Sequence, residues 1–459
     1  MEHLLPQIAG AQWSMPGDWT ALAGKIGLAG AGRLVELGSV MAGLAPVGNF
    51  LHLAGFRLLS VLRGLALCAI LASAMLYLLQ CLAGAGFARR ARRRPPAAEE
   101  LEVALLKPLH GFSPGQLAAV SSFLDIDYGR RRLVLGLTDK DDPARRIVEE
   151  LHRRSATVPI EVVVGEEPAT NRKVGKLMRL AASAGGAPIL VMSDADVMVE
   201  RDYLRRIVAE LAADPSVGMV TCLYRGLPFS DRLAARLEAL FVNTDFAPMA
   251  MLSYYIEPMR HAYASTIAAK REALEAAGGL AAVKDSYGDD ILLARRAARA
   301  GYEIRLSSAA VTTLTEQESF ADFWAQQVRG ARVDRRIRPI SLGRILVNGP
   351  FWALVLLALS RLSAEACWLF AAAVGLRMAV AAFTLRIALR LPTGLLKDLW
   401  LVPIKDLIMA AVWAVGLTGN TVEWRGRRLM LLGGGKYAPA VGPAGGPTRS
   451  DGAPVTVDS

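Results

Sequence analysis

The feature that most constrains this chain is an uncharged stretch of 24 residues, from Gly64 to Phe87. A helix of this length covers the roughly 30 Å hydrocarbon thickness of a bilayer, so we expect a transmembrane helix over residues 57–88. Five arginines follow within residues 89–94, and such clusters stay on the cytoplasmic side of an inserted helix. The sequence therefore predicts a basic juxtamembrane linker over residues 89–100 and a cytoplasmic location for the part that follows.

The composition agrees with a globular part joined to membrane segments. Of the 459 residues, 53% are hydrophobic and 21% are charged, which is too apolar for one ordinary soluble domain of this length. A net charge of +11 would also suit a nucleic-acid-binding protein, but no aromatic-interleaved basic stretch and no zinc-ligand spacing accompanies it. We therefore expect the basic side chains to meet anionic lipid headgroups of the bilayer, and we expect no nucleic acid partner.

Two further features bound the function. Residues 1–56 form an N-terminal extension without the charged start and short apolar core of a secretory signal, and its role is unknown. The four cysteines are far apart and form no C-x-x-C, and no histidine pair has metal-ligand spacing. The sequence thus indicates neither a disulfide framework nor a zinc site, which fits a reducing cytoplasm.

Residues 101–339 have the periodicity of a cytoplasmic α/β domain. Apolar runs predict strands over 103–106, 132–137, 160–164 and 189–192, with helices over 144–154 and 174–182. Alternation of this kind predicts a mainly parallel sheet with right-handed crossovers and helices on both faces. No G-x-G-x-x-G follows the first strand and no P-loop motif occurs, so a Rossmann dehydrogenase and a P-loop NTPase are disfavoured.

Asp194 and Asp196 directly follow the apolar run Ala187–Met192, which predicts a buried strand that ends at Ser193. Ligands of open α/β sheets bind beyond the carboxyl ends of the strands. Paired carboxylates at such a strand end suit a divalent cation that bridges a substrate's phosphates. Acids at strand ends also cap helices or face water, so this pattern alone leaves that alternative open.

Two more candidates lie downstream. Asp289 and Asp290 precede a predicted helix over residues 291–300, where acids commonly act as N-terminal caps. Gln326 and Arg329 lie on a helical stretch before the next apolar segment, and a solvated amphipathic face would explain them as well. Each candidate is ambiguous when it is considered alone.

Taken in order, these motifs resemble a known family, the membrane-bound ceramide glucosyltransferases and the related bacterial hopanoid glycosyltransferases. The resemblance covers residues 101–339 and implies a GT-A nucleotide-diphospho-sugar transferase domain with transmembrane helices at both ends. The matching positions are Lys107-Pro108-Leu109-His110-Gly111 on K-P-L-x-G, Leu124-Asp125-Ile126-Asp127-Tyr128 on L-x-x-D-Y, Asp139 on the first signature aspartate, Asn171-Arg172-Lys173 on N-P-K, Asp194 and Asp196 on the second acidic site, and Asp290 on the third.

The resemblance implies a donor site for a UDP-sugar. Asp196, with Asp194 beside it, would bind Mg²⁺ or Mn²⁺, and Asp139 would hydrogen-bond the uracil or ribose. The expected donor-binding residues are Lys107, Pro108, Asp139, Lys173, Asp194, Gln326 and Arg329. Lys173 and Arg329 would lie near the diphosphate, and Gln326 would lie at the acceptor end.

The resemblance also implies the catalytic residue. Asp290 would be the general base that takes the proton from the acceptor hydroxyl, which gives direct displacement with inversion. Asp289 is adjacent, so a proton-sharing or substitute role for it stays open.

The chain departs from the family pattern at two positions. Gly330 follows Arg329 where the family usually has the tryptophan of Q-x-x-R-W, so an aromatic wall is missing. Lys176 replaces the asparagine of N-P-K-x-x-N-L, which adds positive charge near the expected phosphates. These changes raise the prospect of an altered acceptor, or of a weakened enzyme.

Residues 340–432 return to membrane character, and residues 433–459 are Gly/Pro/Ser-rich and are expected to be disordered. Apolar stretches run over 345–360, 364–385 and 400–417, but Arg377 interrupts the second stretch and Lys405 and Asp406 interrupt the third. Ionisable residues at membrane depth must face protein, water or a partner. An interfacial helix is the alternative for the third stretch, so three or four membrane segments are expected in all.

A catalytic domain tied to the bilayer favours a lipid acceptor, because a long-chain lipid dissolves poorly in water. Ceramide and a hopanoid polyol both qualify, with glucose or N-acetylglucosamine as the transferred hexose. The stretch Thr221–Gly226 resembles the bacterial branch, which suggests a bacterial inner membrane with the catalytic domain in the cytoplasm. A processive polysaccharide synthase and a non-catalytic membrane protein that retains the fold are the alternatives.

Overall fold

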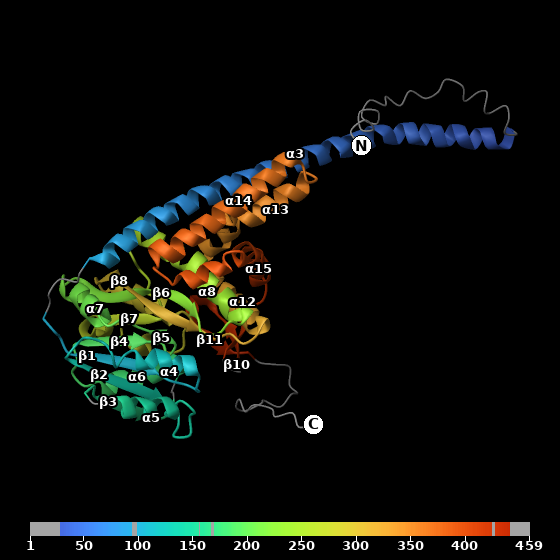
Figure 1. Ribbon diagram of the computed structural model, residues 1–459. Helices are drawn as coiled ribbons and strands as arrows, with labels where there is room; N and C mark the ends of the chain where they lie inside the picture. The colour runs from blue at the N-terminus through green and yellow to red at the C-terminus, as the bar shows by residue number, and fades with distance from the viewer. Residues whose placement is uncertain (1–27, 94–98, 156, 167–168, 425–426, 441–459) are drawn as a thin grey trace, which may run out of the picture. The chain divides into compact units, whose positions relative to one another are not determined.

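The computed structural model describes residues 28–93, 99–155, 157–166, 169–424 and 427–440 (Figure 1). The chain divides into two units, residues 1–65 and residues 66–459. The α-helices are α3 Leu28–Arg92, α4 Pro114–Ser121, α5 Arg145–Arg154, α6 Arg172–Ser183, α7 Tyr203–Ala212, α8 Leu233–Phe241, α9 Ala247–Ile256, α10 Arg271–Ala276, α11 Asp289–Arg299, α12 Phe320–Ile337, α13 Gly349–Leu359, α14 Ala364–Phe383 and α15 Leu401–Gly416. Short π- and 3₁₀-helices are η1 Val242–Phe246, η2 Leu280–Val283, η3 Pro339–Val347, η4 Thr384–Ala388, η5 Thr393–Asp398 and η6 Gly433–Gly435.

One eight-stranded sheet organises the second unit, in the order β3-β2-β1-β4-β7-β6-β8-β5. Its strands are β1 Val103–Pro108, β2 Arg131–Leu137, β3 Ile160–Val164, β4 Ile189–Ser193, β5 Val197–Met198, β6 Val217–Pro228, β7 Thr266–Lys270 and β8 Glu303–Thr315. The pairings β1·β2, β2·β3, β1·β4 and β6·β8 are parallel, whereas β7 is antiparallel to both β4 and β6, and β5 is antiparallel to β8. Only β7 and β5 therefore run against the other strands.

Helices cover both faces of this sheet, because alternate strand residues point to opposite sides. On β1, Ala104 and Leu106 join a core that includes residues of α6, α9 and α11. Val103 and Leu105 join a second core with residues of α4, α5 and α7. The predicted α/β fold with helices on both faces is confirmed. The two antiparallel strands were not anticipated, since strand direction follows from the connections between strands and not from the composition of a strand.

The carboxyl ends of β1, β2, β4 and β8 meet at one edge of the sheet, because these four strands share one direction. The Lys107-Pro108 pair ends β1, the loop with Asp139 follows β2, and Asp194 follows β4. Motifs that lie far apart in the sequence are thereby delivered to one place.

Apolar helices flank the α/β domain. Residues 54–92 of α3 and residues 364–388 are long and apolar enough to cross a membrane, and the pair formed by residues 341–347 and α13, bent by 56°, would make a third such span. The helix predicted over 57–88 lies within α3, which begins at Leu28. Helices α13 and α14 lie alongside α3 (Figure 1), where Ile70, Ala353 and Ala373 share an apolar cluster. Helix α15 has 16 residues and is not among the helices of the described residues that are long and apolar enough to span a membrane.

The charged residues of these apolar segments pair with one another. Arg377 of α14 forms ion pairs with Asp406 of α15 at 2.8 Å and with Asp245 of η1 at 2.6 Å. Lys405 of α15 pairs with Asp406 at 2.7 Å and also contacts Asp245. Arg377, Lys405 and Asp406 are all buried. This buried charge network contains two cations and two anions, so it is neutral, and it joins α14 and α15 to the α/β domain through η1.

A second sheet of three strands, in the order β11-β10-β9, follows α15. It comprises β9 Thr421–Trp424, β10 Arg427–Leu431 and β11 Tyr437–Pro439, and both pairings are antiparallel. The prediction of disorder from residue 433 onward is therefore wrong up to Pro439. Composition suggested disorder, but pairing with β10 and packing against the α/β domain order this segment. Residues 1–27 of the N-terminal extension and residues 441–459 of the tail lie outside the described residues.

Candidate active site

The two acids after β4 lie in a turn that the backbone holds from both sides. The Asp194 N–H donates to the Ser265 carbonyl at 3.2 Å, and the Asp196 carbonyl accepts from the Leu314 N–H at 3.1 Å. Both side chains are half-buried. Burial and the adjacent Asp194 raise the pKa of Asp196 to about 7. A carboxylate whose pKa is raised by an adjacent carboxylate favours a bound cation.

Lys107 lies beneath this turn. Its side chain is buried, and its ammonium donates to the Asp194 carbonyl at 2.6 Å and to the Ser193 hydroxyl at 3.1 Å. The ammonium also lies 3.8 Å from the ring centroid of Phe123. Burial lowers the pKa of Lys107 to about 7, against the opposing effect of Asp196 and Asp194. The structure thus places Lys107 as a support of the turn, while Pro108 ends the strand that carries it.

Lys173 brings the two acidic pairs together. It lies in the first turn of α6, whose N-cap is Asn171, and its ammonium pairs with Asp194 at 2.5 Å. Burial lowers the pKa of Lys173, but the charges of Asp194, Asp289 and Asp290 outweigh it and raise that pKa above its usual value. The positively charged ammonium of Lys173 therefore lies among these carboxylates, at the edge of the sheet where a diphosphate would lie.

Asp289 and Asp290 begin α11. Asn171 donates from its amide to the Asp289 carboxylate at 3.1 Å and to the Ser286 carbonyl at 3.0 Å, so the N-R-K motif and this acidic pair are one structure. The N-cap is Gly288, in the left-handed region at φ 66°, and both acids lie in the first turn. Neither acid is the N-cap residue, but the Asp290 carboxylate accepts from the Ile291 N–H at 2.8 Å, so it satisfies a first-turn N–H as the capping interpretation expected. Burial and the adjacent Asp289 raise the pKa of Asp290 to about 7.

Asp139 lies in an exposed loop after β2, where its carboxylate accepts from the Asp141 N–H at 2.8 Å. The buried Asp142 in the same loop was not among the predicted site residues. Asp142 accepts from the Gly111 and Ala144 N–H groups, both at 2.9 Å. Burial raises the pKa of Asp142, but hydrogen bonds from His110, Ala144 and Gly111 outweigh it and lower that pKa to about 2. This carboxylate ties the loops after β1 and β2 together.

Lys176, which replaces the family's asparagine, is buried between the same two loops. Its ammonium contacts the Leu109 carbonyl and donates to the Thr138 hydroxyl at 3.1 Å. A Cβ at Gly136 would lie 2.8 Å from Cγ of Lys176, so the glycine leaves room for this side chain. The Lys176 ammonium therefore joins the loop after β1 to the loop after β2.

Gln326 and Arg329 lie on α12 near a half-buried acid, Glu238, that was not among the predicted site residues. Gln326 donates to the Glu238 carboxylate at 2.5 Å and also contacts Gln317. Burial raises the pKa of Glu238, against hydrogen bonds from both glutamines and the charge of Arg329. Glu238 lies on α8, far away in sequence, and only the packing of α8 on α12 reveals the pairing. A Cβ at Gly330 would meet no atom within 4 Å, so the space of the missing tryptophan is open.

The residues suited to a divalent cation are Asp194 and Asp196. The described residues contain no group of three or more His, Cys, Asp or Glu side chains placed to hold a metal. Mg²⁺ is commonly bound by one or two carboxylates together with substrate phosphates, so a pair of carboxylates at this edge fits such a cation. Its remaining ligands would come from the donor.

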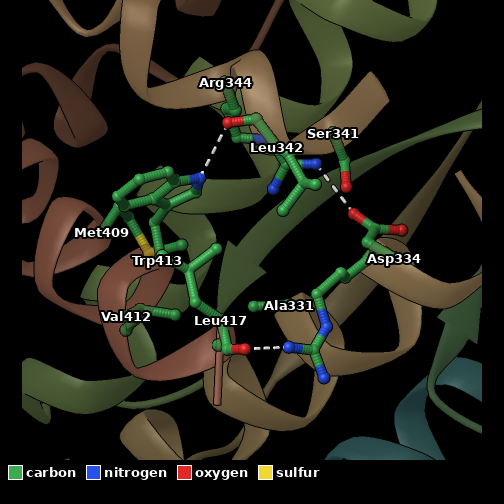
Figure 2. A pocket seen from close by; sticks show the side chains of 11 residues that line it. Ala331, Asp334, Ser341, Leu342, Arg344, Met409, Val412, Trp413 and Leu417 are labelled. Atoms are coloured by element: carbon green, nitrogen blue, oxygen red, sulfur yellow. Dashed lines mark hydrogen bonds and ion pairs between the residues drawn. The ribbon is translucent and has the colours of Figure 1, made fainter. Parts of the chain in front are cut away.

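A small cavity lies elsewhere in the molecule, between α12, η3 and α15 (Figure 2). Leu342, Met409, Val412, Trp413 and Leu417 form its apolar lining, and the ion pair of Arg344 with Asp334 lies beside it. None of the predicted site residues lines this cavity. The predicted acidic residues Asp194 and Asp196 lie instead at the carboxyl end of β4.

Comparisons with known proteins identify the family of this chain. The model of glycosyl transferase family 21 matches residues 65–437. Ceramide glucosyltransferase 3 of Caenorhabditis elegans is 22% identical over 210 residues, which make up 45% of this chain and 44% of that protein, so the match spans less than half of the relative's length.

Solved structures of glycosyltransferases are also similar. A mannosyltransferase from Pyrobaculum calidifontis in complex with GDP-Man and Mn²⁺ has a TM-score of 0.45 and 19% identity, over 77% of this chain and 99% of that chain. Glucosyl-3-phosphoglycerate synthase from Mycobacterium tuberculosis has a TM-score of 0.32 and 14% identity, over 52% and 84% of the two chains. The family match and the sheet described above confirm the predicted family and GT-A fold. The chain belongs to glycosyl transferase family 21.

Proposed function

We propose that this protein is a membrane-integral, inverting glycosyltransferase that moves one hexose from a UDP-sugar to a hydroxyl group of a lipid. The observation that carries the proposal is the position of Lys173, which pairs with Asp194 at 2.5 Å and whose pKa is raised by Asp289 and Asp290 as well. The Lys173 side chain thus links Asp194 of the proposed metal site with Asp289 and Asp290, the pair suited to proton transfer.

The chain's own residues divide the work of this reaction. Asp194 and Asp196 would hold Mg²⁺ or Mn²⁺, which as a Lewis acid neutralises charge on a diphosphate leaving group. Lys173 and Arg329 supply further positive charge there, and the exposed Asp139 is available to the nucleoside. Asp290, whose pKa is raised to about 7, takes the proton of the acceptor hydroxyl as that oxygen attacks the anomeric carbon.

An aromatic wall between this site and the apolar helices supports a lipid acceptor. Tyr224 stacks on Phe246 with ring centroids 4.1 Å apart, and Phe246 meets the edge of Tyr263 at 5.1 Å. Burial and the charge of Asp290 raise the pKa of Tyr224. Phe246 belongs to η1, which the buried charge network joins to α14. These rings thus link the surroundings of the proposed base to η1, and an acceptor with an apolar body would suit such surroundings.

Ceramide and a hopanoid polyol are the acceptors that we propose, with glucose or N-acetylglucosamine as the sugar, at a bacterial inner membrane with the catalytic domain in the cytoplasm. A processive polysaccharide synthase is a weaker candidate, because a polymer channel requires more membrane helices than the two or three found in the described part of the chain. The open space at Gly330 is the observation that favours a non-catalytic protein.

A transfer assay on the full-length protein in lipid nanodiscs with Mn²⁺ tests the proposal. UDP-glucose and UDP-N-acetylglucosamine are each offered with ceramide and with bacteriohopanetetrol, and the lipids are analysed by mass spectrometry. We expect a single added hexose on one acceptor, and loss of that product in the Asp196→Ala variant. A ladder of polymer lengths would establish a processive synthase, and no product from any pair would contradict the proposed acceptors.

A further inference from the structure

The C-terminal three-stranded sheet packs directly against the turn that precedes the proposed base. The Tyr287 N–H donates to the Gly435 carbonyl at 2.7 Å, and the Tyr437 N–H donates to the Asp285 carbonyl at 3.1 Å. Ser286 and Lys436 form an antiparallel bridge between these two bonds. Residues 435–437 therefore add a short strand to the turn that ends at Asp289.

Side chains reinforce this docking. The rings of Tyr287 and Tyr437 lie with centroids 5.3 Å apart, and the Tyr287 hydroxyl donates to the Leu432 carbonyl at 2.5 Å. Gly435 has φ 79°, and a Cβ there would lie 2.8 Å from Cδ1 of Leu292 on α11. This close approach requires glycine, because any side chain would push the segment away from α11.

The same turn is held from its other sides by the N-R-K motif and by α12. Two hydrogen bonds fix Asn171 against this turn. Its backbone N–H donates to the Lys284 carbonyl at 2.9 Å, and its side-chain amide donates to the Ser286 carbonyl at 3.0 Å. A Cβ at Gly288 would lie 2.3 Å from Cδ1 of Ile337, so the end of α12 packs closely on the turn. The C-terminal sheet supplies the remaining support.

Helix α12 also holds the C-terminal sheet. Arg332 donates to the Thr421 carbonyl at 2.8 Å, and Arg335 donates to the Gly419 carbonyl at 2.6 Å. Tyr437 thus lies in a segment fixed on one side to α12, which carries Arg329, and on the other to the turn before Asp289. Burial, supported by the charge of Asp289 and opposed by that of Arg329, raises the pKa of the Tyr437 hydroxyl to about 12.

We infer that Tyr437 is a positioning residue of the active site, and that β11 holds the Asp285–Gly288 turn so that Asp289 and Asp290 keep their places at the start of α11. Tyr437 acts through its ring contact with Tyr287 and through the backbone pairing of its strand. The catalytic part of this inference rests on the proposed function, whereas the structural part does not.

Hydrogen–deuterium exchange on the full-length protein in nanodiscs tests the structural part without any substrate. Tyr437→Ala and Gly435→Ala should each speed exchange in the peptide that spans residues 285–290, because they loosen the segment whose Gly435 carbonyl accepts from the Tyr287 N–H. Tyr437→Phe keeps the ring contact with Tyr287 and should speed exchange less than Tyr437→Ala. Met430→Ala, a change at a partly exposed residue of β10, is the control and should leave that peptide unchanged.

Activity tests the catalytic part, with the donor and acceptor that the wild-type protein uses. Tyr437→Ala and Gly435→Ala should lower kcat about tenfold or more, since small displacements of reacting groups are costly, while the Kd of the UDP-sugar stays within about twofold. Tyr437→Phe, which keeps the ring, should lower kcat less than Tyr437→Ala does. Unchanged exchange or unchanged kcat in Tyr437→Ala would overturn the inference, as would an equal effect of Met430→Ala. Absence of turnover in the wild type would contradict the proposed function alone, because the exchange result would still stand.

Discussion

At the scale of single residues, burial separates the acids of this site into different roles. Asp142 accepts two backbone N–H groups and has a pKa lowered to about 2, so it is a permanently ionised structural group. Asp290 is half-buried beside Asp289 and has a pKa raised to about 7. Hydrogen-bond donors explain the lowered pKa of Asp142, whereas burial and the adjacent Asp289 charge explain the raised pKa of Asp290. A carboxyl group that titrates near neutrality suits proton transfer.

Replacement of the proposed base tests its role directly. Asp290→Asn keeps the shape of the side chain but removes the proton acceptor, so we expect kcat to fall by about 10²-fold or more with the Kd of the UDP-sugar nearly unchanged. Donor binding is measured by calorimetry and turnover by mass spectrometry of the lipid. Asp289→Asn is the matched control, and its kcat should fall less than that of Asp290→Asn. Unchanged turnover in Asp290→Asn would assign the proton transfer to another group.

The same residue predicts a pH dependence. A carboxyl group accepts a proton only when it is ionised, and the folded pKa of Asp290 is about 7, so activity should be present above this value. We expect kcat/KM, which reports the free enzyme, to fall about tenfold per pH unit below roughly pH 7. The profile is measured at saturating Mn²⁺, which keeps Asp196 ionised. A profile that stays flat down to pH 5 would mean that Asp290 is not the base.

Metal removal distinguishes the two acidic pairs. EDTA should abolish transfer, and Mn²⁺ or Mg²⁺ should restore it, because Asp194 and Asp196 are placed to share a cation with the donor's diphosphate. Asp196→Ala should lower both donor affinity and turnover, in contrast to Asp290→Asn. Activity that is indifferent to chelation would refute the metal assignment and leave Lys173 and Arg329 as the only diphosphate partners among the residues discussed.

At the scale of elements, the buried charge network explains how apolar helices tolerate ionisable residues. Arg377 on α14 and Lys405 on α15 interrupt apolar stretches, yet each pairs with Asp406 and with Asp245 of η1. The arrangement is neutral and internally hydrogen-bonded, which limits the cost of burying four charges. Because η1 also carries Phe246 of the aromatic wall, the network fixes the junction between the membrane helices and the proposed acceptor region.

Breaking this network should be costly. Asp406→Ala leaves Arg377 and Lys405 buried with one carboxylate, so we expect a loss of about 3–5 kcal/mol in stability. Lys397→Ala, which breaks an exposed ion pair with Asp231, should cost under about 1 kcal/mol. Thermal unfolding of the protein in nanodiscs measures both. Equal effects of the two variants would show that the network does not contribute to stability beyond a surface pair.

At the scale of the whole molecule, contacts of the C-terminal sheet constrain the membrane topology. Residues 435–437 pair with the turn at residues 285–287 of the α/β domain, so both lie on one side of the bilayer. The chain between them must therefore cross the membrane an even number of times. Two crossings, by η3 with α13 and by α14, satisfy this condition when α15 is interfacial. If the bent pair of η3 and α13 is a re-entrant loop, α14 and α15 would make the two crossings.

Site-directed labelling tests this topology. In a cysteine-free variant expressed in intact spheroplasts, Lys140→Cys in the loop after β2 should react with a membrane-impermeant maleimide only after permeabilisation. Arg361→Cys, between α13 and α14, should react before it. Labelling of both positions from outside, or of neither, would contradict the proposed orientation with the catalytic domain in the cytoplasm.

The sequence by itself determined the local features of this protein. The apolar runs closely predicted strands β1 to β4 and the membrane-length part of α3, residues 54–92, but not the start of α3 at Leu28, because periodicity and hydrophobicity are local properties. Ordered motifs indicated the family and each acidic pair. Several facts were decided only by the tertiary structure: that Lys107 supports the turn of Asp194 from below, that Glu238 binds Gln326, that β7 runs against its neighbours, and that β11 is ordered beside Asp289. Each of these joins segments far apart in the chain. Such contacts depend on how the elements pack, and no window of sequence contains both partners.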